Sequence, residues 1–312
     1  MTPRPVVAPE VAAALESGAP VVALESSVFA QGLPQPANRE AARRMTAAVR
    51  AAGATPAITA VVRGVPTIGL ADPDLERFLG RDGVRKVSAR DLPLAVAAGC
   101  DGATTVAASV ALARAAGIHV FATGGLGGVH RQLDASSAVR DESADLVELA
   151  RTPIIVVCAG MKSILDLEAT MERLETLGVS VLGYRTDELP GFLASGTGIP
   201  LGWRVNDATR VAAAWSAQLA LGRESALVVV QQPPAEHALP SDDVERAVRR
   251  ALSSAHDSGV RGAAVTPWLL ARVEHETGGA SLAANVALLE RNAALAGEIA
   301  VALASARISR IR

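Results

Sequence analysis

Short, continuously apolar runs alternate along this chain with longer segments in which apolar residues recur at helical spacing. Apolar runs of this kind are typical of strands buried on both faces, and helices connect such strands in parallel sheets. The alternation therefore predicts an α/β fold, with a mostly parallel central sheet flanked by helices. We expect strands at residues 21–24, 58–62, 67–70, 86–88, 119–122, 154–158, 179–183 and 226–230.

The segments between these strands have the spacing of amphipathic helices, and the chain is almost wholly helical from residue 242 onward. No internal repeat, Ser/Gly-rich linker or shift in composition marks a domain boundary. Residues 1–312 are therefore predicted to form a single large domain with a helical C-terminal region. The connecting helices are expected at residues 38–52, 91–98, 105–116, 141–150 and 163–177.

The composition describes a globular protein, because 50% of the residues are hydrophobic and 20% are charged. A net charge of −2 without a basic stripe argues against binding to nucleic acid polymers. No apolar run reaches the roughly 18 residues of a membrane span, and residues 1–10 lack the apolar core of a secretory signal. Cys100 and Cys158 have no metal-ligand spacing, so we expect buried free thiols in a reducing cytoplasm.

Lysine is almost absent from the chain. Only two of the 30 basic residues are lysines, Lys86 and Lys162, and the rest are arginines. An arginine side chain stays protonated, whereas a lysine can lose its proton and attack a carbonyl carbon to form a Schiff base. The two lysines therefore indicate amine chemistry. The alternative is a GC-rich coding bias with two accidental survivors.

Several polar residues are placed where the predicted strands end. We expect Glu25, Lys86, Thr123 and Lys162 to lie at or just past strand ends. Ligands of parallel α/β sheets bind beyond the carboxyl ends of the strands, so these side chains should surround one site. A glutamate such as Glu25 can act there as a general acid with a raised pKa if its pocket is dry.

Lys162 lies in a segment with the features of a strand-to-helix turn. Gly160 permits a tight turn, and Ser163 with Asp166 resembles a capping box that would begin a helix. Lys162 would then face the positive end of the helix dipole, which disfavours a cation but suits a neutral amine or a lysine that meets a phosphate. The alternative is a lysine that extends into solvent beside a helix start.

The glycine-rich loop at residues 123–130 follows a predicted strand. His130 replaces the third glycine of a dinucleotide-binding fingerprint, and no phosphate-binding P-loop motif occurs in the chain. We interpret the loop as a flexible or ligand-hugging turn, and His130 as an acid–base group or a structural histidine. Lys86 is interpreted as a point charge for an anionic ligand, or else as a solvated edge residue.

Three further polar residues have two interpretations each. Asp141 and Asp145 are four residues apart, so on a helix both carboxylates could share one face and help to hold Mg²⁺ or Mn²⁺. The alternative, which we prefer on these residues alone, is an ordinary N-cap for Asp141 and a solvated helix face for Asp145. Asn285 lies in an alanine- and leucine-rich helix, as a core hydrogen-bonding group or as a site residue.

Taken together, a set of sequence blocks resembles one family, the pseudouridine-5′-phosphate glycosidases, also called the indigoidine synthase A family. The resemblance extends from about residue 6 to about residue 303, with the blocks in the family's order. The segment between His130 and Asp141 is longer than usual, and residues 191–203 have fewer aromatic residues than expected. The blocks are ALESS at 23–27, KVS at 86–88, RDLP at 90–93, GATTVAA at 102–108, FATGGLGGVHR at 121–131, SADL at 143–146, VVCAGMKSILD at 156–166 and GYRTDE at 183–188.

The resemblance implies reversible cleavage of the C–C glycosidic bond of pseudouridine 5′-phosphate, giving uracil and ribose 5-phosphate, by a cytoplasmic homotrimer that uses a divalent metal, Mn²⁺. Lys162 matches the lysine that bonds to ribose C1′, Glu25 the proton donor and Asp141 the metal ligand. The positions that match substrate contacts are Lys86, Val106, Ser143, Ala144 and Asp145, and those that match residues lining the site are Thr123, His130 and Asn285.

Two other functions share parts of this pattern. A Schiff-base aldolase or lyase would use the same lysine without releasing uracil, and a non-catalytic sugar-phosphate sensor would use both lysines as phosphate-binding charges. The chemistry of a C-glycoside favours the glycosidase. Such a bond lacks a good leaving group, so the two-carboxylate scheme of ordinary glycosidases fits poorly. A lysine iminium at C1′ provides the electron sink that the reaction needs.

Overall fold

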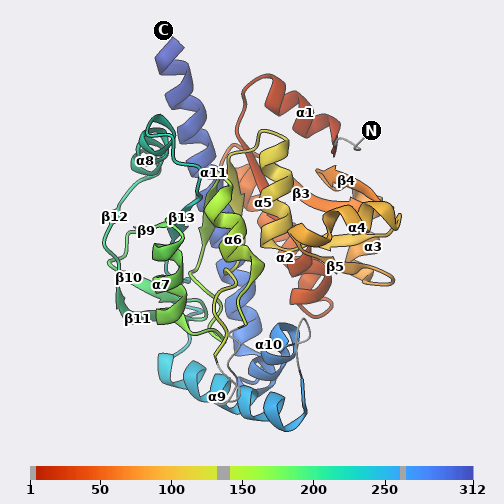
Figure 1. Cartoon of the computed structure of the whole chain (residues 1–312), viewed down its shortest axis with the longest axis vertical. Helices are drawn as coiled ribbons and strands as arrows, with labels where there is room; N and C mark the ends of the chain where they lie inside the picture. Colours follow the sequence, from red (N-terminus) through yellow and green to blue (C-terminus); the bar gives the residue numbers. More distant parts are fainter. Residues whose placement is uncertain (1–4, 132–140, 261–264, 312) are drawn as a thin grey trace.

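The computed structural model describes residues 5–131, 141–260 and 265–311. Its centre is a twisted, mostly parallel sheet (Figure 1), in which only the pairs of β3 with β4 and β6 are antiparallel. This confirms the predicted fold class. The strands follow one another across the sheet as β1 (Val6–Val7), β4 (Val65–Ile68), β3 (Thr55–Val62), β2 (Val21–Glu25), β7 (Val120–Ala122), β8 (Ile155–Cys158), β13 (Leu227–Val230), β9 (Ser180–Tyr184) and β12 (Arg204–Val205), with β6 (Gly102–Thr104) beside β3 and β5 (Arg85–Val87) beside β6.

Strands β2, β7, β8 and β13 form the core of this sheet, and every one of their residues is buried. Burial on both faces is the reason that these strands are apolar, apart from Glu25 at the end of β2, instead of alternating with polar residues. They run parallel to one another, so their carboxyl ends meet at the same edge of the sheet. Whatever follows Glu25, Ala122 and Cys158 is therefore brought together at that edge.

Helices cover both faces of the sheet (Figure 1). On one face lie α5 (Val106–Ala115), α6 (Ala144–Arg151) and α7 (Leu167–Thr176). On the other face, the long helix α11 (Ala280–Ile311) packs against strands β2, β7 and β8. It also packs against α2 (Ala37–Ala51) and α8 (Ala208–Ala220).

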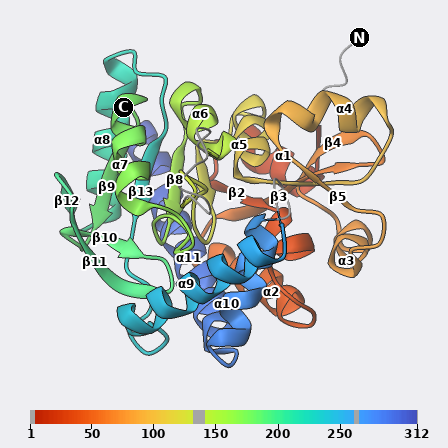
Figure 2. The ribbon, with the colours of Figure 1, turned by 60° about the horizontal axis from the view of Figure 1, so that its bottom comes forward.

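A helical cap covers the carboxyl edge of the central strands. We use this name for α9 (Ser241–Asp257) and α10 (Val265–Glu276), which pack against each other at the bottom of Figure 1 and come to the front in Figure 2. Helix α9 also packs against β11 (Ala194–Pro200), which forms a separate two-stranded sheet with β10 (Glu188–Gly191). The predicted helical C-terminal region is thus confirmed. Its first two helices, α9 and α10, cover the edge of the sheet where ligands of such folds bind.

Two predicted helices begin later than expected. Helix α6 starts at Ala144 instead of residue 141, and α7 starts at Leu167 instead of residue 163. In both places the residues before the helix form isolated bridges with the glycine-rich loop, Glu142 with Val129 and Leu165 with His130. Tertiary pairing therefore overrides the local helical pattern. The prediction also missed α1 (Pro9–Glu16), α3 (Asp72–Gly80), the short strands β1, β6 and β12, and helix α8.

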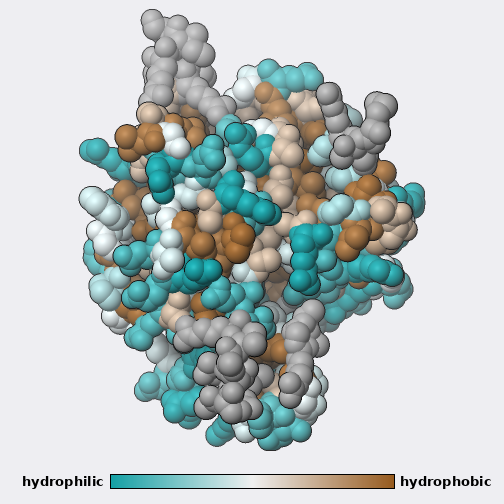
Figure 3. Space-filling model, in the orientation of Figure 1, coloured by the Kyte–Doolittle hydropathy of each residue, from teal (hydrophilic) through white to brown (hydrophobic). Residues whose placement is uncertain are grey.

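The outer surface is mixed in character. Figure 3 shows hydrophilic and hydrophobic residues interspersed over one face of the molecule. Among the described residues, no helix is both long and apolar enough to span a membrane. Cys158 is buried and Cys100 is half-buried, and both are free thiols as predicted. Burial raises the pKa of the Cys158 thiol to about 12, so this thiol is inert at neutral pH.

Candidate active site

A cavity of about 270 Å³ lies between the carboxyl ends of the central strands and helix α10. The parallel strand order explains why residues from position 25 to position 285 meet there. Ten of the eleven predicted site residues line this cavity, and Asp141 does not. The ten are Glu25, Lys86, Val106, Thr123, His130, Ser143, Ala144, Asp145, Lys162 and Asn285.

Glu25 is the last residue of β2, and only 5% of its surface is exposed. The Ser27 hydroxyl donates a hydrogen bond to one carboxylate oxygen at 2.7 Å, and the Thr123 hydroxyl donates to the other. Thr123 directly follows β7, which pairs in parallel with β2, so the two strand ends deliver both groups to the same point. The carboxyl group is thereby held in one orientation toward the cavity.

Lys162 lies in the loop between β8 and α7, and the predicted helix start beside it is wrong. Asp166 caps α7 by accepting a hydrogen bond from the Ala169 N–H at 3.0 Å, whereas the buried Ser163 hydroxyl has no hydrogen-bond partner among the described residues. Lys162 is therefore not at a helix N-terminus, and the helix dipole does not act on it as predicted. Instead, the backbone N–H of Lys162 donates a hydrogen bond to the Leu126 carbonyl at 3.0 Å, which ties this loop to the glycine-rich loop.

Lys86 lies on β5, an edge strand whose one partner in the described sheet is β6. Its side chain lines the cavity, yet it remains accessible to solvent. Crowding by protein lowers the pKa of Lys86, and the ammonium group of Lys162 lowers it further, while Glu25 and Asp145 act in the opposite direction. The two lysines act on each other within one cavity.

His130 ends the glycine-rich loop and is half-buried at the cavity wall. The backbone N–H of His130 donates a hydrogen bond to the Asp141 backbone carbonyl at 2.9 Å. Burial lowers the pKa of His130 below its ordinary value of 6.5, and the positive charges of Lys162 and Lys86 lower it further against the opposing effect of Asp141. The imidazole is therefore neutral at pH 7, where it can accept as well as donate a proton.

The glycine-rich loop, interpreted from the sequence as a flexible or ligand-hugging turn, is closely packed, which favours the second interpretation. A side chain on Gly127 would lie 2.8 Å from an Asp145 carboxylate oxygen, and one on Gly125 would collide with Phe192. Gly124, Gly125 and Gly127 all line the cavity, as expected of a turn that contacts a ligand. Glycine is required here by close approach and not by a left-handed backbone, since none of the three has a positive φ.

Asp145 explains part of this packing, because its carboxylate binds two segments at once. It accepts hydrogen bonds from the Gly127 N–H at 2.9 Å and from the Ala107 N–H at 3.1 Å. With 6% of its surface exposed, Asp145 does not lie on a solvated helix face, so that alternative is wrong. Ser143, and not Asp141, is the N-cap of α6, since its hydroxyl accepts from the Asp145 N–H at 3.2 Å.

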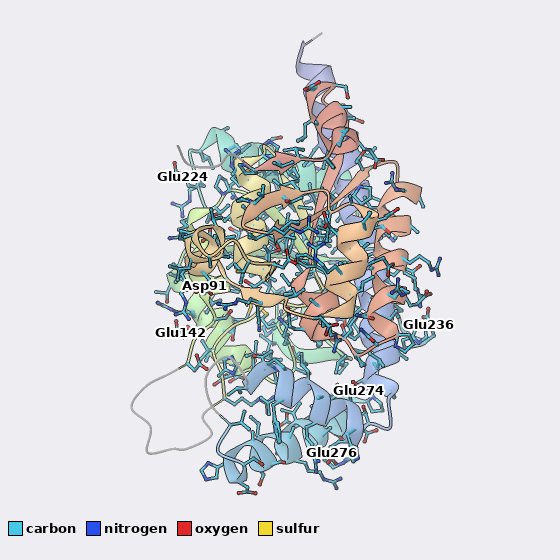
Figure 4. All side chains as sticks on the ribbon, turned by 90° about the vertical axis from the view of Figure 1, so that its right-hand side faces the viewer. Asp91, Glu142, Glu224, Glu236, Glu274 and Glu276 are labelled. Atoms are coloured by element: carbon cyan, nitrogen blue, oxygen red, sulfur yellow. The ribbon has the colours of Figure 1, made fainter. Side chains whose placement is uncertain are left out.

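The predicted metal ligand lies outside the cavity. Asp141 is exposed and precedes α6, so it shares no helix face with Asp145. Within the described ranges, no group of three or more His, Cys, Asp or Glu side chains could hold a metal ion. The acidic residues labelled in Figure 4 are likewise spread over the molecule, apart from Glu274 and Glu276, which both lie on α10. The long segment noted before Asp141 lies, over residues 132–140, outside the described residues.

Asn285 is half-buried on α11 and lines the cavity, which favours a site residue over a core group. The sequence analysis missed Asn292, seven residues further along the same helix. Its amide nitrogen donates to the carbonyls of Thr123 at 2.8 Å and Gly124 at 3.2 Å. Two turns of helix place residues 285 and 292 on one face, so a second asparagine at this spacing was a signal available in the sequence.

Comparisons with known proteins cover nearly the whole chain. Residues 10–302 match the family model described as "Indigoidine synthase A like protein". A protein of Gemmatimonas aurantiaca named pseudouridine-5′-phosphate glycosidase is 64% identical over 300 residues, which are 96% of each chain. A protein of the same name from Herpetosiphon aurantiacus is 53% identical over 298 residues, 96% of this chain and 97% of the relative.

Two solved structures have the same fold. The prealnumycin C-glycosynthase AlnA, in complex with ribulose 5-phosphate, has a TM-score of 0.89 and 38% sequence identity. An indigoidine synthase A-like protein of Thermotoga maritima has a TM-score of 0.88 and 36% identity. Each comparison covers 97% of this chain and 98% of the other.

Proposed function

This chain belongs to the indigoidine synthase A-like family, and we propose that it reversibly cleaves the C–C glycosidic bond of pseudouridine 5′-phosphate to give uracil and ribose 5-phosphate. The observation that carries the proposal is the 64% identity, over 96% of the chain, to a relative that is named for this activity. A single cavity that contains a lysine, a buried carboxyl group and a second cation supports it.

Lys162 is the proposed nucleophile. Its neutral amine forms a bond to ribose C1′ while the ring bond from C1′ to O4′ breaks, and Glu25 gives a proton to O4′. Glu25 then takes a proton from the new C1′-bound nitrogen, which frees the nitrogen lone pair. The lone pair forms the C=N bond of an iminium as the bond from C1′ to uracil C5 breaks and C5 receives the proton from Glu25. Water hydrolyses the iminium, which releases ribose 5-phosphate and restores the lysine.

The charges around the cavity suit a phosphorylated substrate. Lys86 supplies a cation on the cavity wall, and Val106 lines the cavity at the N-terminal end of α5. The positive end of a helix favours a phosphate at such a position, although the Ala107 N–H of α5 already donates to the Asp145 carboxylate. We propose that the phosphate lies between these groups, with Thr123, His130 and Asn285 around the base and sugar.

Formation of the same bond is a second candidate direction. The structural neighbour that binds ribulose 5-phosphate is named a C-glycosynthase, so this fold also supports synthesis of a C–C glycosidic bond in a protein 38% identical to this chain. The Schiff-base aldolase and the sugar-phosphate sensor remain the alternatives to a glycosidase. Release of uracil excludes the first, and covalent trapping on Lys162 excludes the second.

Two further features of the family are kept as separate proposals. We propose that turnover requires a divalent metal, with Mn²⁺ as the preferred ion and Asp141 as its ligand. The described residues do not form a site for this ion, so no step above uses it. We also propose a homotrimer, which light scattering of the purified protein tests directly.

The decisive experiment combines product analysis with chemical trapping. The protein is incubated with pseudouridine 5′-phosphate and Mn²⁺, borohydride is added, and the intact mass is measured. We expect an adduct of the mass of ribose phosphate on Lys162 and free uracil in solution. Lys162→Arg is the matched control, since it keeps the charge but cannot form an iminium. A folded wild-type protein that gives neither adduct nor uracil would refute the proposal.

A further inference from the structure

Arg131 directly follows the glycine-rich loop and has no role in the chemistry described above. Its guanidinium group joins three places in the structure. The Nε–H donates to the Leu165 carbonyl at 3.0 Å, and one terminal nitrogen donates to the Ser163 carbonyl at 3.3 Å. The two terminal nitrogens also donate to both carboxylate oxygens of Glu245, at 2.8 and 2.9 Å.

The two carbonyls belong to the loop that carries Lys162. Between β8 and α7, neither a strand nor a helix fixes this loop, and Lys162 lies one residue before Ser163. The loop is held instead by individual hydrogen bonds, including those from the Lys162 N–H to Leu126 and from the Asp166 N–H to the Val129 carbonyl at 3.0 Å. The side chain of Arg131 thus fixes two backbone carbonyls on the C-terminal side of Lys162, those of Ser163 and Leu165.

The carboxylate of Glu245 belongs to the helical cap. Glu245 lies on α9, which packs against α10, and α10 supplies Thr266, Pro267 and Leu270 to the cavity wall. The side chains of Arg131 and Glu245 are 26% and 37% exposed, so this ion pair is partly shielded from water. The Arg131 guanidinium also lowers the pKa of Glu245, which is ionised at neutral pH.

We propose that Arg131 is a positioning residue that fixes the Lys162 loop and the helical cap in one geometry. The proposal rests on the proposed function of Lys162. A planar guanidinium can donate to two carbonyls and a carboxylate at the same time, whereas an ammonium group donates from a single point. The reactive amine must lie within a near-attack distance of C1′, and a displacement of about 1 Å can lower the rate of an enzyme by about 10²-fold.

The test compares Arg131→Met, Arg131→Lys and Glu245→Gln with Arg249→Met as the control. Arg249 also contacts Glu245, at 3.2 Å, but its side chain is 69% exposed. We expect Arg131→Met to lower kcat about 100-fold with at most a threefold change in KM. Arg131→Lys should restore little of this loss, Glu245→Gln should lower kcat about tenfold, and Arg249→Met should match the wild type.

The readouts separate positioning from a purely structural role. The rate at saturating substrate and the thermal unfolding midpoint are measured for each variant. The rate of formation of the borohydride-trapped adduct is followed in single turnovers. A loss of kcat at an unchanged midpoint, with slower adduct formation, supports the proposal. A wild-type kcat in Arg131→Met overturns the proposal. A wild-type kcat in Arg131→Lys, beside a lowered kcat in Arg131→Met, overturns it as well. If Arg131→Met does not fold, equal kcat values for Glu245→Gln and Arg249→Met overturn it instead.

The same experiment distinguishes this inference from the proposed function. If the wild-type protein releases no uracil, the proposed function fails and the variants cannot be ranked by turnover. If the wild type is active and Arg131→Met is equally active, the positioning role alone fails.

Discussion

The close packing of Gly127 makes a sharp prediction for the substitution Gly127→Ala. The added methyl group would lie 2.6 Å from the Ser143 Cβ and 2.8 Å from the Asp145 carboxylate oxygen, and it would collide with the Ser143 hydroxyl. These neighbours cannot yield easily, because Asp145 is buried and hydrogen-bonded to two backbone N–H groups, and Ser143 caps α6. The loop, the helix start or both must move.

The cost of this movement has two parts. Overpacking a well-packed site costs about 1–3 kcal/mol. If one hydrogen bond to the Asp145 carboxylate is lost as well, about 1.5–3 kcal/mol is added. If both parts apply, we expect the free energy of unfolding to fall by roughly 2.5–6 kcal/mol, which a domain in the middle of the usual range of about 5–15 kcal/mol tolerates without unfolding. Because Ser143 and Asp145 line the cavity, kcat/KM should fall together with stability.

The assay measures urea unfolding and initial rates of uracil release at one temperature for the wild type and the variant. Gly80→Ala serves as the matched control, since Gly80 lies in α3 with open space around it and a negative φ. Alanine there should leave activity unchanged and raise stability by up to about 1 kcal/mol. A Gly127→Ala protein with wild-type stability and rate would show that the loop is adaptable, and the reasoning from close approach would be wrong.

Four further outcomes test the site. Ser27→Ala removes one of the two donors to Glu25 and should lower kcat about tenfold, the equivalent of about 1.4 kcal/mol, in a steady-state assay. Because the pKa of His130 is lower in the folded protein, the unfolded chain binds this proton at a higher pH than the folded chain does. The free energy of unfolding should therefore fall as the pH is lowered from about 6.5 through the pKa of the folded protein. Urea unfolding of His130→Asn should show a smaller loss over that pH range. Dialysis against EDTA should abolish turnover and Mn²⁺ should restore it, with a weaker response in Asp141→Asn; full activity after dialysis would contradict the metal proposal. Lys86→Arg should keep measurable turnover at a raised KM, because the guanidinium keeps the positive charge but is bulkier than the compact ammonium group.

The sequence was sufficient to predict the central strands of the sheet, because burial on both faces leaves a clear record in strands such as 154–158, but not its short strands β1, β6 and β12. The cavity followed from the same prediction, since parallel strands bring their carboxyl ends together. The helix starts at residues 141 and 163 were wrong for a physical reason. The residues there pair with the glycine-rich loop, and a contact between segments so far apart in the chain leaves no periodic signal. Asn292 and Arg131 were missed because their other partners are backbone carbonyls, which every residue has, and because Glu245, the carboxylate partner of Arg131, lies 114 residues further along the chain.

The positions of the two lysines favour amine chemistry over an accident of coding bias, the two alternatives that their scarcity left open. If coding bias had spared two lysines at random positions, the chance that a given one lies among the 26 residues that line the cavity would be 26 in 312. The chance that both lie there would be less than one in a hundred. Both line it. An amine is needed only once for an iminium, so the second lysine requires another reason. Its ammonium group lies close enough to interact electrostatically with Lys162. Under the proposed function, Lys86 on its edge strand supplies a compact cation for the substrate phosphate, while Lys162 supplies the reacting amine.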